Sequence, residues 1–253
     1  MPELAGKTAL VTGGSRGIGA AIARALAQAG MRVAVHYGRS RDEAEAVLRS
    51  LGGDGHLLVQ ADVAVPEEAC RMVAEAGDAL GRLDVLVNNA GMFEPTPFDT
   101  EGFDEWQAGW KTILDTNLMS AVHATWAALP LMKAKGGGKV INVASRSAFR
   151  AETEAPAYAV SKAGMVNLTR CLARAEAKNN ILAYCIAPGF VETAMARDSV
   201  RELGMAALTA DIPLRRIATV EDVAGVAVFL ASDAANYLTG ITIPVAGGSW
   251  MST

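Results

Sequence analysis

Short hydrophobic runs alternate with longer amphipathic stretches along almost the whole chain. The short runs are rich in β-branched and apolar residues and predict seven strands, at Thr8–Val11, Arg32–His36, His56–Gln60, Val85–Asn88, Lys139–Val143, Ile181–Ile186 and Thr242–Val245. The longer stretches predict six helices, near Gly17–Ala29, Arg41–Ser50, Pro66–Leu80, Phe103–Lys133, Ala157–Ala177 and Val220–Leu230. Alternation of this kind is typical of βαβ units, so we expect an α/β fold with a parallel sheet covered by helices on both faces.

The chain has 253 residues and no linker-like stretch, which favours one domain over residues 1–253. One long segment, Gly189–Pro213, contains no clear strand and mixes charged with apolar residues. A segment of this length beside an active site is often a lid, so we predict a substrate lid at about residues 189–213. A helical hairpin on the surface is the alternative, and it is compatible with a lid.

A glycine-rich stretch, Thr12-Gly-Gly-Ser-Arg-Gly-Ile-Gly19, follows the first predicted strand and leads into the first predicted helix. Gly13, Gly17 and Gly19 give the spacing GxxxGxG, a relative of the dinucleotide fingerprint. Glycines turn tightly and let the backbone approach a pyrophosphate at the N-terminus of a helix. The position of the stretch therefore predicts a dinucleotide site.

The end of the second predicted strand should reach the adenosine ribose of that dinucleotide. An NAD enzyme usually has an acidic residue there, but this chain reads His36-Tyr-Gly-Arg-Ser40 and has no carboxylate before Asp42. Arg39 and Arg16 could instead bind a 2′-phosphate through charge-assisted hydrogen bonds, although both could also be solvated surface residues. We therefore predict NADP(H) as the cofactor.

Tyr158 and Lys162 are four residues apart, and Ser145 lies thirteen residues before the tyrosine. Residues at i and i+4 share one helix face, so the Lys162 ammonium can lie close to the Tyr158 phenol. A nearby cation lowers the pKa of a phenol from its usual value of about 10 toward the range where acid–base catalysis is efficient. The alternative for the isolated pair is a buried tyrosine and a lysine that extends to the surface.

Composition excludes several other classes of protein. A net charge of −4 argues against a general nucleic-acid binder. The cysteines are scattered, and the three histidines are isolated from one another, so we expect structural roles for them and no metal site: Cys70, Cys171, Cys185, His36, His56 and His123. Because we find neither an apolar run of membrane-spanning length nor a leader sequence, we expect a cytoplasmic protein without a membrane partner.

Together these features resemble the short-chain dehydrogenase/reductase family, in its single-domain form of roughly 250 residues, over essentially the whole chain. The resemblance rests on an ordered set of motifs: Thr12–Gly19, Asp62-Val63, Asn88-Asn-Ala-Gly91, Asn117, Ser145, Tyr158-x-x-x-Lys162, Pro188-Gly189 and Gly247-Gly248. It implies a Rossmann-type, doubly wound domain with a seven-stranded parallel sheet, a nicotinamide cofactor, and commonly a homotetramer.

The resemblance also implies a role for each catalytic residue. Tyr158 would be the general acid in reduction and the general base in oxidation, and Lys162 would lower its pKa and bind the nicotinamide ribose. Ser145 would polarise the substrate carbonyl as a pre-positioned donor. Asn117 would hold a water that connects Lys162 to solvent.

The cofactor would be bound by residues spread along the chain. By resemblance they are Gly13, Ser15, Arg16, Gly17, Ile18, Gly19, Arg39, Ser40, Asp62, Val63, Asn89, Ala90, Gly91, Tyr158, Lys162, Pro188, Gly189, Val191 and Thr193. Within this set Asp62 and Val63 would contact the adenine, while the last four would line the nicotinamide. Asn88 would stand at the cofactor side of its strand end.

The substrate is less well defined by the sequence than the reaction. The leading hypothesis is an NADPH-dependent reductase of a small-molecule ketone, which could be carrier-protein-linked, as in 3-oxoacyl-(acyl-carrier-protein) reductases. Basic residues that could dock an acidic carrier are Lys133, Lys135, Lys139 and Lys178. The alternatives are an alcohol, polyol or sugar dehydrogenase and a nucleotide-binding regulator without catalysis. Arg150 could meet an anionic substrate, or form an ion pair with Glu152 or Glu154.

Overall fold

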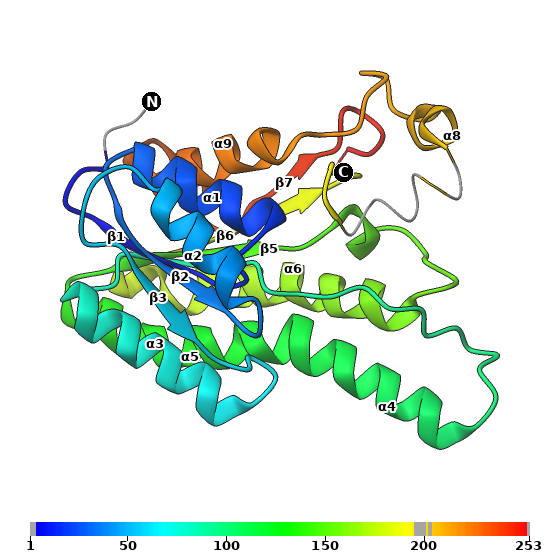
Figure 1. Cartoon of the computed structure of the whole chain (residues 1–253), viewed down its shortest axis with the longest axis horizontal. Coiled ribbons are helices and arrows are strands. Elements are labelled where there is room, and N and C mark those ends of the chain that lie inside the picture. Colours follow the sequence, from blue (N-terminus) through cyan, green and yellow to red (C-terminus); the bar gives the residue numbers. More distant parts are fainter. Residues whose placement is uncertain (1–3, 195–200, 202–203, 252–253) are drawn as a thin grey trace.

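The computed structural model describes residues 4–194, 201 and 204–251. Seven parallel strands form one sheet in the order β3-β2-β1-β4-β5-β6-β7 (Figure 1). The strands are β1 (Thr8–Val11), β2 (Arg32–Tyr37), β3 (Leu57–Gln60), β4 (Val85–Asn88), β5 (Gly138–Val143), β6 (Ile181–Pro188) and β7 (Thr242–Val245). All seven predicted strands are therefore confirmed, with ends that shift by two residues at most.

Helices cover both faces of this sheet, as the alternating pattern predicts. One face carries α1 (Gly17–Gln28), α2 (Arg41–Ser50) and α9 (Val220–Ala231). The other carries α3 (Pro66–Leu80), α4 (Phe103–Leu114), α5 (Ser120–Ala134) and α6 (Pro156–Glu176) (Figure 1). In the part of the chain that the structure describes, no helix is long and apolar enough to cross a membrane.

The two faces of the sheet form two hydrophobic cores because successive strand residues point to opposite sides. On β2, Val33 and Val35 pack with α1 and α9, while Ala34 between them packs in the core beneath α3 and α5. All three side chains are fully buried. Burial on both faces explains why these strands read as continuous apolar runs rather than as alternating patterns.

The strand order reverses between β1 and β4, so the connections after these strands run to opposite faces. In open α/β sheets, ligands bind beyond the carboxyl ends of the strands at such a switch point. The loop after β1 is the glycine-rich stretch, and the loop after β4 is Asn89-Ala-Gly91. The topology therefore brings the two motifs together at one edge of the sheet.

One predicted helix differs from the structure, and the predicted lid is described only in part. The single helix expected at Phe103–Lys133 is divided into α4 and α5 by a π-helical turn at Asp115–Met119. The predicted lid at about 189–213 contains the short helix α8 (Met205–Thr209) and a parallel bridge between Val191 and Ala218. The rest of that prediction falls partly on 195–200 and 202–203, which lie outside the described residues.

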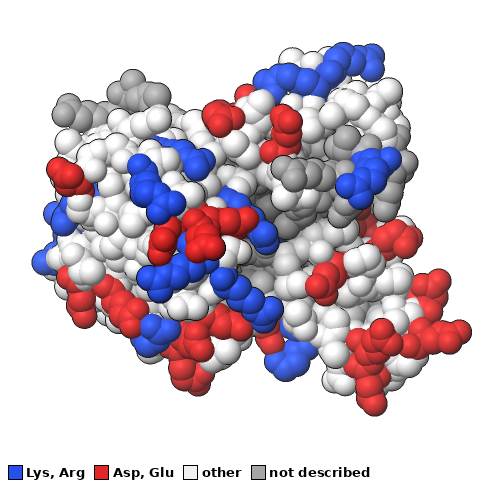
Figure 2. Space-filling model, in the orientation of Figure 1, with Lys and Arg blue, Asp and Glu red and all other residues white. Residues whose placement is uncertain are grey.

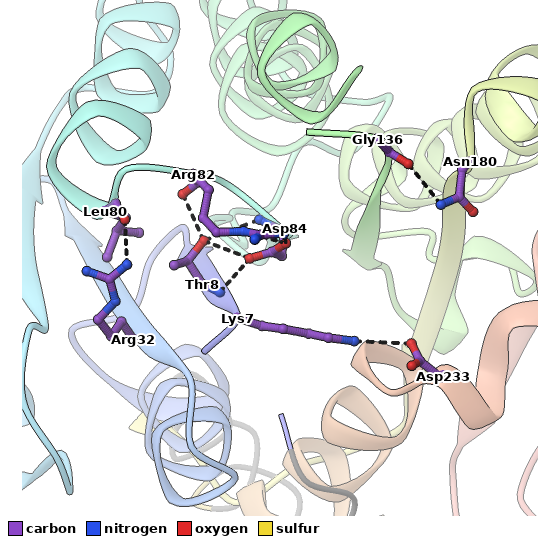
Figure 3. Close-up of polar contacts among 9 residues, drawn as sticks. All are labelled: Lys7, Thr8, Arg32, Leu80, Arg82, Asp84, Gly136, Asn180 and Asp233. Atoms are coloured by element: carbon purple, nitrogen blue, oxygen red, sulfur yellow. Dashed lines mark hydrogen bonds and ion pairs between the residues drawn. The ribbon is translucent and has the colours of Figure 1, made fainter. Parts of the chain in front are cut away.

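Polar contacts join the strands at the opposite, amino edge of the sheet (Figure 3). The Asp84 carboxylate accepts the backbone N–H of Thr8 at 2.8 Å and pairs with Arg82 at 2.5 Å. Nearby, Lys7 pairs with Asp233 at 3.1 Å, but the Asp233 side chain is 77% exposed whereas that of Asp84 is 11% exposed. Burial therefore makes Asp84 the more important of the two acids for stability.

Replacing Asp84 by alanine should lower the free energy of unfolding by about 2–3 kcal/mol, because the buried Thr8 N–H loses its partner. The matched change Asp233→Ala removes an exposed pair and should cost less than about 1 kcal/mol. Urea unfolding followed by circular dichroism measures both variants. Equal losses would contradict this ranking.

Candidate active site

A cleft of about 1620 Å³ opens at the carboxyl ends of the strands, around the switch point. It is lined by every predicted cofactor residue except Pro188, Gly189 and Val191. Those three pack behind the lining: the Gly189 N–H bonds the carbonyl of Val245 on β7, and Val191 is buried in its bridge with Ala218. Lys and Arg side chains border a hollow near the middle of the face shown in Figure 2.

The glycine loop is packed so closely that side chains are excluded at two positions. A Cβ on Gly19 would lie 2.2 Å from the carbonyl oxygen of Gly13. Gly13 has a φ of +62°, and a Cβ there would lie 2.9 Å from the Cα of Ala90. The loop therefore needs glycine for close backbone approach, as expected for a cradle that binds a pyrophosphate at the start of α1.

Hydrogen bonds fasten this loop to the end of β4. The Asn89 side chain donates to the carbonyl oxygens of Thr12 and Gly13 at 2.9 and 3.1 Å. In return, the Thr12 hydroxyl accepts the N–H groups of Asn89 and Ala90 at 2.9 and 3.0 Å. Asn88 is the last residue of β4, where it is buried and donates to Asn142 at 2.8 Å.

The end of the cleft beside β2 and β3 carries two arginines that have no side-chain partner among the described residues. Arg16 and Arg39 are exposed, line the cleft, and make no side-chain hydrogen bond or ion pair with any described residue. Asp62 also lines this end, where its N–H is bonded by Glu68 at 2.7 Å. The residues that sequence reasoning missed here come from β3 and α3, including Glu68 and Arg71. These residues lie far along the sequence from the glycine-rich motif, so no sequence pattern indicated that they would line the cleft.

Three of the four predicted catalytic residues, Ser145, Tyr158 and Lys162, come together at the other end of the cleft, which Tyr158 and Lys162 line. Ser145 follows β5, its hydroxyl accepts the Ser147 N–H at 3.1 Å, and it lies close enough to Tyr158 to lower the pKa of the phenol. Lys162 is buried, and its ammonium lies 5.7 Å from the centre of the Tyr158 ring and donates to the carbonyl of Val143 at 3.0 Å. The i, i+4 spacing on α6 thus places lysine beneath tyrosine as the sequence predicts.

Burial dominates the pKa values of this pair. It raises the pKa of the Tyr158 phenol, an effect that the Ser145 hydroxyl opposes and the negative charge of Glu152 reinforces. Burial lowers the pKa of Lys162 to about 8. We expected Lys162 to lower the pKa of the phenol, but Lys162 is not among the groups that shift this pKa. The sequence spacing predicts the proximity of the two groups but not the depth of their burial.

Asn117 lies in the π-helical turn and is fully buried. Its side chain accepts the N–H of Met92 at 2.8 Å and donates to the carbonyl of the same residue at 2.9 Å. A Cβ on Gly91 would lie 3.2 Å from the Asn117 oxygen and 3.4 Å from the Lys162 ammonium, so both groups border one point. The extra residue in the turn brings Asn117 to this position, a common use of π-bulges.

Phe93 is a further residue at the catalytic end that sequence reasoning missed. Its ring is 46% exposed, lines the cleft, and meets the Tyr158 ring edge-on at 5.2 Å. The signal that could have found it is its position two residues after the motif Asn89-Ala-Gly91. An apolar wall beside Tyr158 suits an apolar part of a bound molecule.

The loop that follows Ser145 carries charge into the same region. The Arg146 guanidinium lies over the Phe190 ring at 4.2 Å, and Asp211 lies 3.9 Å from Arg146 and 3.4 Å from Arg150. Arg150 thus pairs with Asp211 rather than with the glutamates expected from sequence. Across the described ranges, no group of three or more His, Cys, Asp or Glu side chains could hold a metal ion.

Comparison with known proteins agrees with this geometry. The family model described as "Enoyl-(Acyl carrier protein) reductase" matches residues 13–249. The chain is 39% identical to the 3-oxoacyl-(acyl-carrier-protein) reductase of Staphylococcus aureus over 247 residues, which covers 97% of this chain and 98% of the relative.

Two solved structures are also similar. The structure of a protein assigned as a short-chain alcohol dehydrogenase of Sinorhizobium meliloti has a TM-score of 0.90 and 39% identity, covering 98% of this chain and 97% of that one. A 7α-hydroxysteroid dehydrogenase solved with NADH and a 7-oxo bile acid has a TM-score of 0.91 and 32% identity, covering 97% and 95%. The chain therefore belongs to the short-chain dehydrogenase/reductase family, as an oxidoreductase of CH–OH and C=O groups.

Proposed function

We propose that the protein is an NADPH-dependent carbonyl reductase in which Tyr158 protonates the substrate oxygen. The observation that carries this proposal is the meeting of Ser145, Tyr158 and Lys162 at one end of a cleft whose other end is a glycine cradle. When bound, the cofactor supplies the hydride for reduction or accepts it in oxidation. The protein places the ketone and moves the proton.

Each catalytic side chain has a part that follows from its environment. The Ser145 hydroxyl donates to the carbonyl oxygen and stabilises the negative charge that develops there. A Tyr158 phenol whose pKa is raised by burial keeps its proton at neutral pH, and an alkoxide is basic enough to take it. Lys162, with a pKa of about 8, and the neighbouring Asn117 lie on the route by which that proton is replaced.

NADP(H) is favoured over NAD(H) by the charges at the adenosine end. Arg16 and Arg39 have no partner among the described side chains, so a 2′-phosphate could take both without breaking an ion pair. Ser40, which lines the same part of the cleft, adds a hydroxyl donor.

The substrate that we propose to test first is a 3-oxoacyl thioester, because several relatives reduce this group on a carrier protein. Within one chain, the positions of the lysines predicted to dock a carrier protein give little support to a carrier-linked substrate. Lys133 and Lys135 lie at the end of α5, beside the amino end of β5 and thus across the sheet from the cleft. Lys139 is buried and donates to the carbonyl of Ser232. The relatives therefore carry the first candidate, and a reductase or dehydrogenase of small ketones or alcohols remains the second.

The remaining proposals concern the whole protein. We keep one domain over residues 1–253, a lid at about 189–213, a homotetramer and a cytoplasmic location as predictions. The exposed apolar side chains of Trp126 on α5 and Val160 on α6 support subunit contacts through these helices.

Tyr158→Phe should lower the rate of ketone reduction by roughly 10²–10⁴-fold, because the acid is lost. The dissociation constant for NADPH should change by less than about threefold, since the ring remains. Initial rates and fluorescence titration measure these two quantities. Tyr237→Phe, at an exposed position, is the control, and an undiminished rate in Tyr158→Phe would refute the proposed acid.

Arg39→Ala should raise the dissociation constant for NADPH by roughly 10- to 100-fold, through the loss of charge-assisted hydrogen bonds. The value for NADH, which has no 2′-phosphate, should change by less than about twofold. Isothermal titration with both nucleotides makes the comparison. Arg49→Ala, farther along α2, serves as the control. If both nucleotides are weakened equally by Arg39→Ala, the preference for NADP(H) is wrong.

A substrate panel with each nucleotide tests the function itself. It contains a 3-oxoacyl thioester on a carrier protein, the same acyl group on coenzyme A, small ketones, and simple or polyhydroxy alcohols. We expect NADPH-dependent reduction of a ketone in the panel. Nucleotide binding without turnover of any compound would favour the regulator hypothesis instead.

A further inference from the structure

The His36 side chain joins two of the loops that form the cofactor cleft. It is 2% exposed and lines the cleft at the end of β2. Its Nδ1 accepts the N–H of Gly13 at 2.9 Å, and its Nε2 lies 3.1 Å from the carbonyl oxygen of Ala61. Gly13 belongs to the glycine cradle, while Ala61 precedes the predicted adenine contact Asp62. The imidazole therefore joins the glycine cradle to the segment that carries the predicted adenine contact.

These two bonds define the state of the ring. A backbone N–H can only donate, so Nδ1 must be unprotonated, and a carbonyl can only accept, so Nε2 must carry the hydrogen. Only the neutral Nε2–H tautomer satisfies both partners. The main chain of the same residue adds a third bond, because the carbonyl of His36 accepts the N–H of Gly14 at 2.8 Å.

Protonation of Nδ1 would set two N–H groups against each other at a buried position. The Gly13 N–H would lose its acceptor, and the cradle could keep its geometry only at a cost of about 1–3 kcal/mol. Close packing leaves little room for adjustment, since a Cβ on Gly13 would already lie 2.9 Å from Ala90. A charged His36 is thus incompatible with the cradle as it stands.

The structure assigns to His36 the role of a positioning residue that holds the glycine cradle in its binding form only while the imidazole is neutral. The inference rests on the proposed nucleotide site and extends it with a proton-linked control of affinity. The histidine takes part in no chemical step.

The surroundings set the direction of the pH dependence. Burial lowers the pKa of His36 from 6.5, the Ala61 carbonyl and the negative charge of Asp62 raise it, and burial is the largest of the three. The other charged groups at this end are Arg16 on the cradle and Arg39 after β2. Because the neutral form binds, nucleotide affinity should be full at pH 7.5 and should fall once the pH drops below the lowered pKa of His36 in the free chain, by up to about tenfold per pH unit.

Two variants separate the two side-chain bonds. The amide oxygen of asparagine can occupy the place of Nδ1, so His36→Asn keeps an acceptor for Gly13 that does not titrate. The amide of glutamine reaches the place of Nε2, so His36→Gln keeps only the Ala61 bond. We expect His36→Asn to bind nearly as well as wild type at pH 7.5 and to lose the pH dependence, while His36→Gln binds roughly tenfold more weakly at every pH.

The experiment is a titration of NADH and NADPH between pH 5 and 7.5. NADH is the main probe because a phosphate also titrates near pH 6 and would add its own pH dependence to NADPH. His56→Asn is the matched control: His56 likewise accepts a backbone N–H through Nδ1, from Val33 at 3.1 Å, but lies outside the cleft lining. It should keep the wild-type pH profile.

A wild-type affinity for NADH that stays flat to a pH below the pKa of His36 would overturn the inference, as would an unchanged pH profile in His36→Asn. The proton resonances of His36 in the free wild-type chain give a second measurement, which does not depend on the variants. They should report a pKa below 6.5 that falls further when NADH binds, and a pKa unaffected by NADH would also overturn the role. Failure of the wild-type chain to bind either nucleotide at pH 7.5 would contradict the proposed function as well.

Discussion

Close packing of the glycine loop against its neighbours is the constraint on which the rest of the site depends. The carbonyl of Gly13 lies where a Cβ on Gly19 would be, and the side chains of Asn89 and His36 fill the space on either side. These contacts join the ends of β1, β2 and β4 into one rigid rim. Since backbone N–H groups at a helix N-terminus bind phosphate only when held in place, the rim decides whether the cleft can take a dinucleotide.

At the end of the cleft that holds Tyr158 and Lys162, the important factor is how burial shifts the pKa values of these two groups. Ser145, Tyr158 and Lys162 lie on elements that the sheet core fixes, and their burial moves the pKa of the phenol up and that of the ammonium down. Both shifts favour the neutral forms. A neutral phenol can give a proton to the alkoxide that forms when a carbonyl is reduced. For the reverse reaction, oxidation, an additional positive charge near Tyr158 would be needed to favour the phenolate.

Much of this arrangement was predictable because the information is local. Each strand is a short apolar run, and the Tyr158–Lys162 spacing fixes one helix face. Asn117 was predicted through family resemblance, but its π-helical turn was not, since the sequence Asp115–Met119 looks like ordinary helix. His36 was interpreted as a structural residue for a similar reason. Its partners come from two other loops, so nothing adjacent in sequence indicates the bridge.

The central claim is that hydride reaches a carbonyl carbon while Tyr158 protonates the oxygen. The most direct test offers the enzyme deuterated NADPH with a 3-oxoacyl and a 2-enoyl thioester together, and locates the label by mass spectrometry. We expect deuterium on the carbinol carbon of the 3-hydroxyacyl product and an exchangeable hydroxyl proton from solvent. Deuterium in a saturated acyl product, formed by reduction of the carbon–carbon double bond, would contradict this mechanism.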